Sequence, residues 1–169
     1  KRDAAIDVAR TREYRYDSMG RMIASLDAIG SAKLANANTP DAIEAIWNAH
    51  AIGYEYDIMG RVVAQIATNG ARSSRVYNDT GRVAYSIDAN GYITAYTYTD
   101  LGQVKSKRTL ARALAPALRD SLDSMTCDRL DSMIEPMFND AHDSIARYAY
   151  NRLGQCIDVL NGNDHRSYE

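Results

Sequence analysis

A tyrosine followed four residues later by a glycine, and then by Arg or Gln, occurs five times in this chain. The glycines are Gly20, Gly60, Gly81, Gly102 and Gly154, and the intervals between them are 40, 21, 21 and 52 residues. Self-similarity at a fixed period indicates an architecture assembled by repetition. The sequence therefore predicts a repeat of about 21 residues that is interrupted by two insertions.

The repeat is clearest between the third and fourth of these glycines. Residues 82–88 alternate polar and apolar side chains, which places Val83, Tyr85 and Ile87 on one face of a strand. Residues 92–98 are rich in Tyr and Thr and are predicted to form the returning strand. Each repeat is therefore expected to contain two antiparallel strands.

Two turns connect these strands. Asn90-Gly91 is a strong hairpin signal because both residues accept positive φ, and Gly102 stands where a type I turn with a bulge needs a left-handed residue. The other turn recurs ten residues after the first glycine of a repeat, at Gly30, Gly70 and Gly91. A Tyr-x-Tyr pair precedes the first turn in four of the five repeats.

Both insertions are predicted to be helical and to fall at or near the second turn. The first covers about 31–49, where Thr39 is a suitable N-cap before Pro40. The second covers 110–146, and Pro116 and Pro136 are expected to start or interrupt its helices. These helices either pack an apolar stripe on one face of the sheet or form a docking surface. The candidate residues for such a surface are Trp47, Leu130, Met133, Met137 and Phe138.

Composition narrows the range of functions. Hydrophobic residues make up 46% of the 169 residues, which is enough for a buried core, and the net charge of −2 does not favour binding to nucleic acid. The cluster Lys105, Lys107 and Arg108 is interpreted as a solvated strand face. No apolar run is long enough to span a bilayer. Cys127 and Cys156 lie far apart, so that one bridge or two unpaired buried thiols are expected.

No residue pattern indicates a catalytic, metal or cofactor site. None of the histidines His50, His142 and His165 has a ligand partner at helical spacing, and His142 is interpreted as part of an exposed helix. The acid pairs Asp120/Asp123 and Asp128/Asp131 are interpreted as solvated helix faces. We expect a chain that is not an enzyme.

The acidic residues of the turns also have a structural explanation. Asp17 and Asp57 are predicted to cap their turns with the side chain rather than to bind Ca²⁺. The arginines that end the turns are expected to pair with an acid of a neighbouring hairpin or to stack on a tyrosine ring.

The turn motif resembles the YD repeat of the Rhs/YD-repeat superfamily, which includes Rhs polymorphic toxins, the C-component of Tc toxins, wall-associated proteins and teneurins. Two instances match it fully and three are degenerate. The full matches are Tyr16-Asp17-x-x-Gly20-Arg21 and Tyr56-Asp57-x-x-Gly60-Arg61. The degenerate ones are Tyr77 with Gly81 and Arg82, Tyr98 with Gly102, and Tyr150 with Gly154.

The resemblance implies a mainly β fold of consecutive antiparallel hairpins with helical insertions. It divides the chain into hairpins over 1–109, a helical insertion over 110–146 and a further hairpin over 147–169. In this family the hairpins form a large shell, which in the toxin members encloses a cytotoxic domain. The implied partners are the rest of a longer parent chain and its cargo.

The implied location is secreted or at the cell surface, as a bacterial secretion-system effector or an extracellular protein. The chain begins without Met, and we expect it to be a fragment or a processed product. The alternative is an adhesin-type module that binds carbohydrate or a partner protein through Tyr-rich strands.

Overall fold

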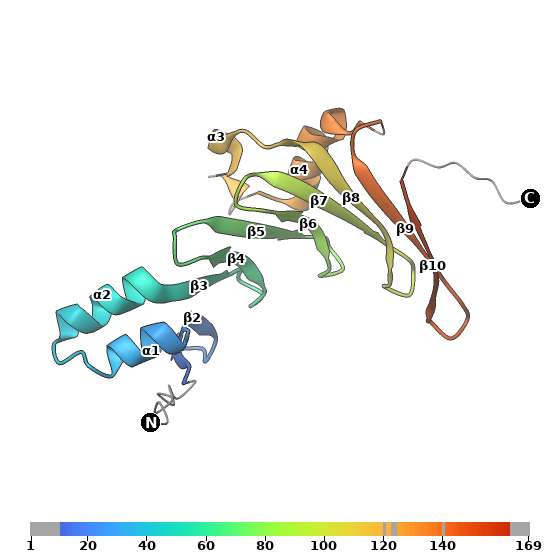
Figure 1. Cartoon of the computed structure of the whole chain (residues 1–169). Coiled ribbons are helices and arrows are strands. Elements are labelled where there is room, and N and C mark those ends of the chain that lie inside the picture. Colours follow the sequence, from blue (N-terminus) through green and yellow to red (C-terminus); the bar gives the residue numbers. More distant parts are fainter. Residues whose placement is uncertain (1–10, 120, 123–124, 140, 163–169) are drawn as a thin grey trace, which may run out of the picture. The chain divides into compact units, whose positions relative to one another are not determined.

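The computed structural model describes residues 11–119, 121–122, 125–139 and 141–162. It divides into two compact units, Lys1–Arg72 and Ser73–Glu169. Ten antiparallel strands are found in the described residues, with helices inserted at two places (Figure 1). The predicted class, mainly β with helical insertions, is confirmed. No helix of the described residues has the length and apolarity needed to cross a membrane.

The first unit holds four strands that pair in sequence order. They are β1 (Glu13–Tyr16), β2 (Met22–Leu26), β3 (Ala51–Tyr56) and β4 (Val62–Ile66). Two helices, α1 (Ala28–Leu34) and α2 (Pro40–His50), lie between β2 and β3 in the sequence. They therefore stand where the second turn of the first repeat was expected.

The second unit also pairs its strands in sequence order. They are β5 (Arg72–Tyr77), β6 (Val83–Ile87), β7 (Tyr92–Tyr98), β8 (Val104–Ala113), β9 (Ser144–Tyr150) and β10 (Cys156–Asn161). The helices α3 (Pro116–Arg119) and α4 (Cys127–Ile134) and the 3-10 turn η2 (Glu135–Met137) connect β8 to β9.

The predicted alternation of side chains is confirmed in β6 and β7. Tyr85 is paired with Ala95 and Ile87 with Ile93, so these four share one face, and Tyr85, Ile87 and Ile93 are buried there. Since successive side chains point to opposite faces, the other face of β7 carries Tyr92, Thr94 and Tyr96.

The first insertion begins earlier than predicted. Gly30 does not form a turn with positive φ but lies inside α1, where Asp27 is the N-cap and its side chain accepts a hydrogen bond from the Gly30 N–H. A Cβ at Gly30 would lie 2.8 Å from Cδ2 of Leu26, so glycine is needed here for close packing. The predicted N-cap Thr39 and the first helical residue Pro40 are confirmed in α2.

The second insertion contains less helix than predicted. Strand β8 continues to Ala113 and β9 starts at Ser144, so strands occupy both ends of the range 110–146. Leu114 and Leu122 lie outside α3, yet both are buried in the same cluster. Pro116 begins α3 and Pro136 lies in η2, as predicted.

The core of the second unit joins this insertion to one face of the sheet. Leu130 and Ile134 of α4 are fully buried against a cluster that includes Ile87, Ile93 and Leu110. Burying an aliphatic side chain of this size contributes about 1.5–3 kcal/mol. The insertion therefore packs its apolar stripe on the sheet, which is the first of the two interpretations considered.

The turns differ from prediction in one respect. Asn90 was expected to share the positive φ of a two-residue turn, but among the described residues only glycines have positive φ. The N–H of Gly91 donates to the Asp88 carbonyl and the N–H of Asp88 to the Tyr92 carbonyl, as at the first turns. Both turns of the repeat therefore use one geometry.

Candidate functional site

We call the tyrosine that begins each repeat motif the signature tyrosine. The turn that follows it is capped by the side chain of a residue within that turn. In the first repeat, Oδ1 of Asp17 accepts hydrogen bonds from the N–H groups of Met19 and Arg21, both at 2.9 Å. Its Oδ2 accepts from Nε of Arg21 at 2.7 Å. The hydrogen bond from the Arg21 N–H is the main reason that the pKa of Asp17 lies below its ordinary value. The predicted capping role is confirmed.

The other repeats, full and degenerate, keep an oxygen at the same position. Asp57 repeats the arrangement of Asp17, with Nε of Arg61 at 2.6 Å from its Oδ2. Asn78 and Asn151 accept from the same two backbone positions, and Oγ1 of Thr99 accepts from the N–H of Gln103. The turn therefore requires an acceptor rather than a carboxylate, and this explains how the motif tolerates substitution.

Successive repeats are joined through the signature tyrosine, and we call the contact between this tyrosine and the preceding repeat a joint. In the first unit, the Tyr56 hydroxyl donates to the Met22 carbonyl at 2.7 Å, and the Arg21 guanidinium lies 4.8 Å from the centre of the Tyr56 ring. A further hydrogen bond runs from Nη1 of Arg21 to the Asp57 carbonyl at 3.4 Å. Arg21 therefore stacks on the tyrosine of the next repeat, and its acidic partner is Asp17 of its own turn.

The same joint is found between the third and fourth repeats, in the second unit. The Tyr98 hydroxyl donates to the Val83 carbonyl at 2.7 Å, and the Arg82 guanidinium lies 5.7 Å from the centre of the Tyr98 ring. Burial, and then the neighbouring Tyr96, raise the pKa of Tyr98, although Arg82 lowers it. The hydroxyl is therefore neutral and available as a donor.

The joint between the fourth and fifth repeats differs because Gln103 replaces the arginine. The Tyr150 hydroxyl still donates to the preceding repeat, at 2.9 Å from the Val104 carbonyl. Gln103 donates from Nε2 to the Gly154 carbonyl at 3.0 Å. In each of the joints described here the acceptor is the carbonyl of the residue that follows the Arg or Gln of the previous turn.

The remaining signature tyrosines differ in exposure, whereas the turn glycines share one backbone conformation. Tyr16 is 59% exposed on β1, whereas Tyr77 is half-buried on β5 opposite Val83. Gly20, Gly60, Gly81, Gly102 and Gly154 all have φ between 77° and 84°. Arg61 directly precedes β4 and forms an ion pair with Asp57.

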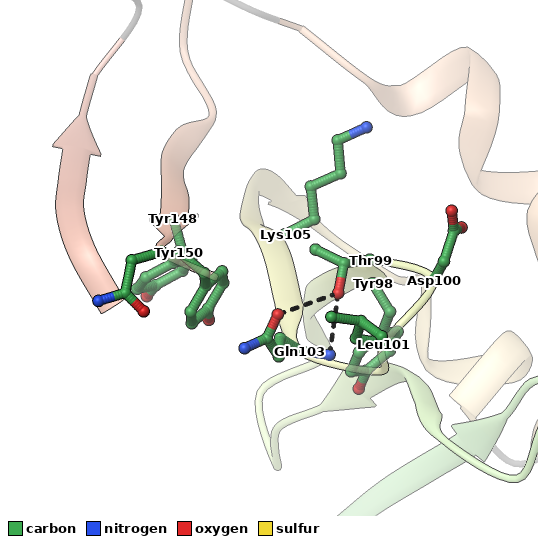
Figure 2. A pocket seen from close by; sticks show the side chains of 9 residues that line it. Tyr98, Thr99, Asp100, Leu101, Gln103, Lys105, Tyr148 and Tyr150 are labelled. Atoms are coloured by element: carbon green, nitrogen blue, oxygen red, sulfur yellow. Dashed lines mark hydrogen bonds between the residues drawn. The ribbon is translucent and has the colours of Figure 1, made fainter. Parts of the chain in front are cut away.

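An open groove of about 450 Å³ lies at the joint that contains Gln103. Its lining residues are Tyr98, Thr99, Asp100, Leu101, Gln103, Lys105, Tyr148, Tyr150 and Asn151. Figure 2 shows Tyr148 and Tyr150 on one side of Gln103 and Thr99 on the other. Sequence reasoning did not identify this groove, because it depends on the register between two hairpins that are separated by the second insertion.

A buried ion pair was also missed. Asp143 is 7% exposed, its Oδ2 lies 3.0 Å from Nε of Arg108, and its oxygens accept from the N–H groups of Ala111 and Asn139. Lys105 and Lys107 are exposed as predicted, but Arg108 is half-buried on the insertion side of the strand. Asp143 therefore fixes the path by which the insertion returns to the sheet.

The residues considered for a docking surface divide into two groups. Trp47 and Leu130 are buried, and Met133 and Met137 are half-buried, so these four do not present a free apolar patch. Phe138 is 36% exposed, and the Arg108 guanidinium lies 4.6 Å from its ring centre.

Among the residues that the structure describes, the remaining titratable side chains do not form a metal site. Within the described ranges no group of three His, Cys, Asp or Glu side chains could hold a metal ion. His142 lies in a turn and not on a helix, as its N–H bonds to the Asn139 carbonyl. His50 contacts Nζ of Lys33 at 2.8 Å. His165 and the acid pair Asp120/Asp123 lie outside the described residues.

The acid pair on α4 lies on a solvated face, as predicted. Asp128 and Asp131 are both exposed, and Asp131 in addition accepts a hydrogen bond from the Tyr85 hydroxyl and lies beside Cys127. Both cysteines are free; Cys127 is half-buried and Cys156 is exposed, so the expected burial of both thiols was wrong. Burial, together with Asp131 and Asp128, raises the pKa of Cys127 to about 11.

Comparison with known proteins bears on the fold. No protein-family model and no curated protein sequence matches the chain. It is similar to chains in the structure of the Photorhabdus luminescens Tc holotoxin pore with a mutated TccC3, and in the crystal structure of TcdB2-TccC3-Cdc42. Each alignment has a TM-score of 0.50 and 16% identity, and covers 90% of this chain.

The chain spans 5% of the length of these Tc toxin chains. At such low identity the likeness concerns the fold alone. The turn motif suggested a YD-repeat fold, and the solved structures with a similar fold come from Tc toxins. The chain therefore has the fold of a stretch of Tc toxin protein, in agreement with its resemblance to the Rhs/YD-repeat superfamily.

Proposed function

We propose that this chain is a non-catalytic segment of the β-shell of an Rhs/YD-repeat toxin-type protein, secreted or displayed at a cell surface. In the longer protein the shell encloses or presents a toxic cargo. The observation that carries the proposal is the repeated joint, in which a tyrosine hydroxyl of one repeat bonds to the backbone of the repeat before it. Such joints extend a sheet one hairpin at a time.

The last described strand supports the same proposal. All six residues of β10 are exposed, including Ile157, Val159 and Leu160, and among the described strands β10 is paired only with β9. An exposed apolar edge strand readily pairs with a further strand. The strand is therefore suited to receive the next hairpin of a longer array.

The joints favour this role over the adhesin-type module. An adhesin-type module would turn its tyrosines outward to a ligand and would not use them between repeats. The hydroxyls of Tyr56, Tyr98 and Tyr150 are instead engaged with backbone carbonyls. These three tyrosines therefore serve the contact between repeats.

Intact-mass and peptide-mapping analysis of the native protein tests the proposal. We expect these 169 residues inside a much longer polypeptide, one part of which resists added protease until denaturant opens the shell. A native chain of only this length could not enclose a cargo. That result would overturn the proposal and favour a stand-alone binding module.

A further inference from the structure

The joint between the fourth and fifth repeats lacks the cation found at two other joints. Arg21 and Arg82 each place a guanidinium over the tyrosine of the next repeat. At the joint between the fourth and fifth repeats, Gln103 lies beside Gly154, the turn glycine of the fifth repeat. A Cβ added to Gly154 would be 3.2 Å from Nε2 of Gln103. A Cβ at Gly102 would likewise meet the Arg82 guanidinium. The glutamine therefore occupies the arginine position but carries no charge.

The shorter side chain leaves the tyrosine accessible. Tyr150 and Tyr148 line the groove of about 450 Å³, and in the described part of the chain no cation lies over the Tyr150 ring. The groove is open and is lined by both polar and apolar groups. An aromatic face beside such a groove is a favourable site for a cation.

We propose that this groove binds an arginine side chain of a partner protein. Its guanidinium lies over the Tyr150 ring, as those of Arg21 and Arg82 lie over the rings of Tyr56 and Tyr98. The two arginine–tyrosine contacts within the chain therefore serve as the model for the proposed contact with the partner. The proposal rests on this joint alone and is independent of whether the longer protein is a shell.

The polar groups of the groove suit a guanidinium. Oγ1 of Thr99 donates a long hydrogen bond of 3.4 Å to Oε1 of Gln103. This amide oxygen has a second lone pair and can therefore also accept a hydrogen bond from a guanidinium N–H. Asp100 adds an exposed carboxylate to the wall. Lys105 also lines the groove, but Figure 2 shows it extending away from the two tyrosine rings.

A sugar fits the groove less well. Sugar recognition needs several convergent hydrogen-bonding groups, and the Asn151 amide is already engaged. Its Oδ1 accepts from two backbone N–H groups of its own turn, and its Nδ2 donates to Gln155. Lysine is also a poorer occupant than arginine, because only the planar guanidinium stacks on an aromatic face.

Titration of the isotopically labelled 169-residue chain with the peptide acetyl-Gly-Arg-Gly-amide tests this proposal by NMR. We expect saturable shifts of the Gln103 side-chain amide and of the Tyr150 ring. The matched peptide with lysine should bind about fivefold more weakly. The variant Gln103→Arg, which supplies the guanidinium from within, should abolish the shifts without lowering the melting temperature.

Three outcomes would overturn the proposal. The first is equal binding of the arginine and lysine peptides, and the second is undiminished binding to a folded Gln103→Arg variant. The third is that methyl glucoside, and not the arginine peptide, shifts these resonances. Carbohydrate would then be the occupant of the groove.

Discussion

The Tyr98 hydroxyl donates a hydrogen bond of 2.7 Å to the backbone carbonyl of Val83, which belongs to the preceding repeat. Tyr98→Phe removes this donor and leaves the carbonyl without it, so we expect a loss of about 1 kcal/mol in the free energy of unfolding. Chemical denaturation measures the effect. Tyr96→Phe is the matched control on the same strand, and an equal loss in both variants would contradict a specific joint.

The turn glycines are expected to resist substitution for two different reasons. Gly60 has a φ of 79° and open space around a hypothetical Cβ, so Gly60→Val should cost about 1–3 kcal/mol through backbone strain alone. Gly102→Val should cost more, because the added side chain also displaces Arg82 from the Tyr98 ring. Thermal melting of both variants measures the difference.

Gly53→Ala provides the control for this prediction. Gly53 lies in β3 without positive φ, and a Cβ there would be 3.6 Å from the nearest atoms of Ile66, an ordinary contact. A Gly53→Ala variant that melts as low as Gly60→Val would show that the turn geometry is not the cause.

Acid should weaken the turns that contain carboxylates. Burial raises the pKa of Asp57, but the hydrogen bonds and charge of Arg61 outweigh it, so the pKa lies below its ordinary value. A carboxylate with a lowered pKa contributes stability that is complete above its unfolded-state pKa of about 3.9 and is lost as the pH falls through the folded value. We therefore expect unfolding to become easier in that range.

The variant Asp57→Asn isolates this effect, since Asn78 and Asn151 show that an amide can cap the same turn. Its unfolding free energy, measured from about pH 5 down to about pH 2, should depend less on pH than that of the original chain. An identical pH dependence in both proteins would rule out Asp57 as a contributor.

The two thiols should react at different rates. With a pKa of about 11, Cys127 holds about one thiolate in a thousand molecules at about pH 8, and it is half-buried. Iodoacetamide labelling followed by peptide mass analysis should therefore modify the exposed Cys156 first. Asp131→Asn should speed the labelling of Cys127, because it removes the nearest negative charge; unchanged labelling would show that the carboxylate does not control the thiol.

The sequence by itself determined the repeat, the turns and most of the strands. Each turn needs a residue with positive φ near its end, which Gly60 supplies, and a side-chain acceptor for the N–H four residues later, which Asp57 supplies. Both requirements are local, so the sequence reveals them directly. Side-chain alternation along β7 is equally local. Gly30 misled the prediction because the local N-cap Asp27 starts a helix where the period called for a turn.

Only the tertiary structure decided which residues meet across the joints. The acceptor of Tyr56 is Met22, 34 residues earlier, and that of Tyr150 is Val104, 46 residues earlier. The burial of Asp143 against Arg108 and the groove beside Gln103 likewise depend on how the strands align around an insertion. Repetition makes each turn recognisable from its own residues, but contacts between hairpins depend on strand register, which local residue preferences do not fix.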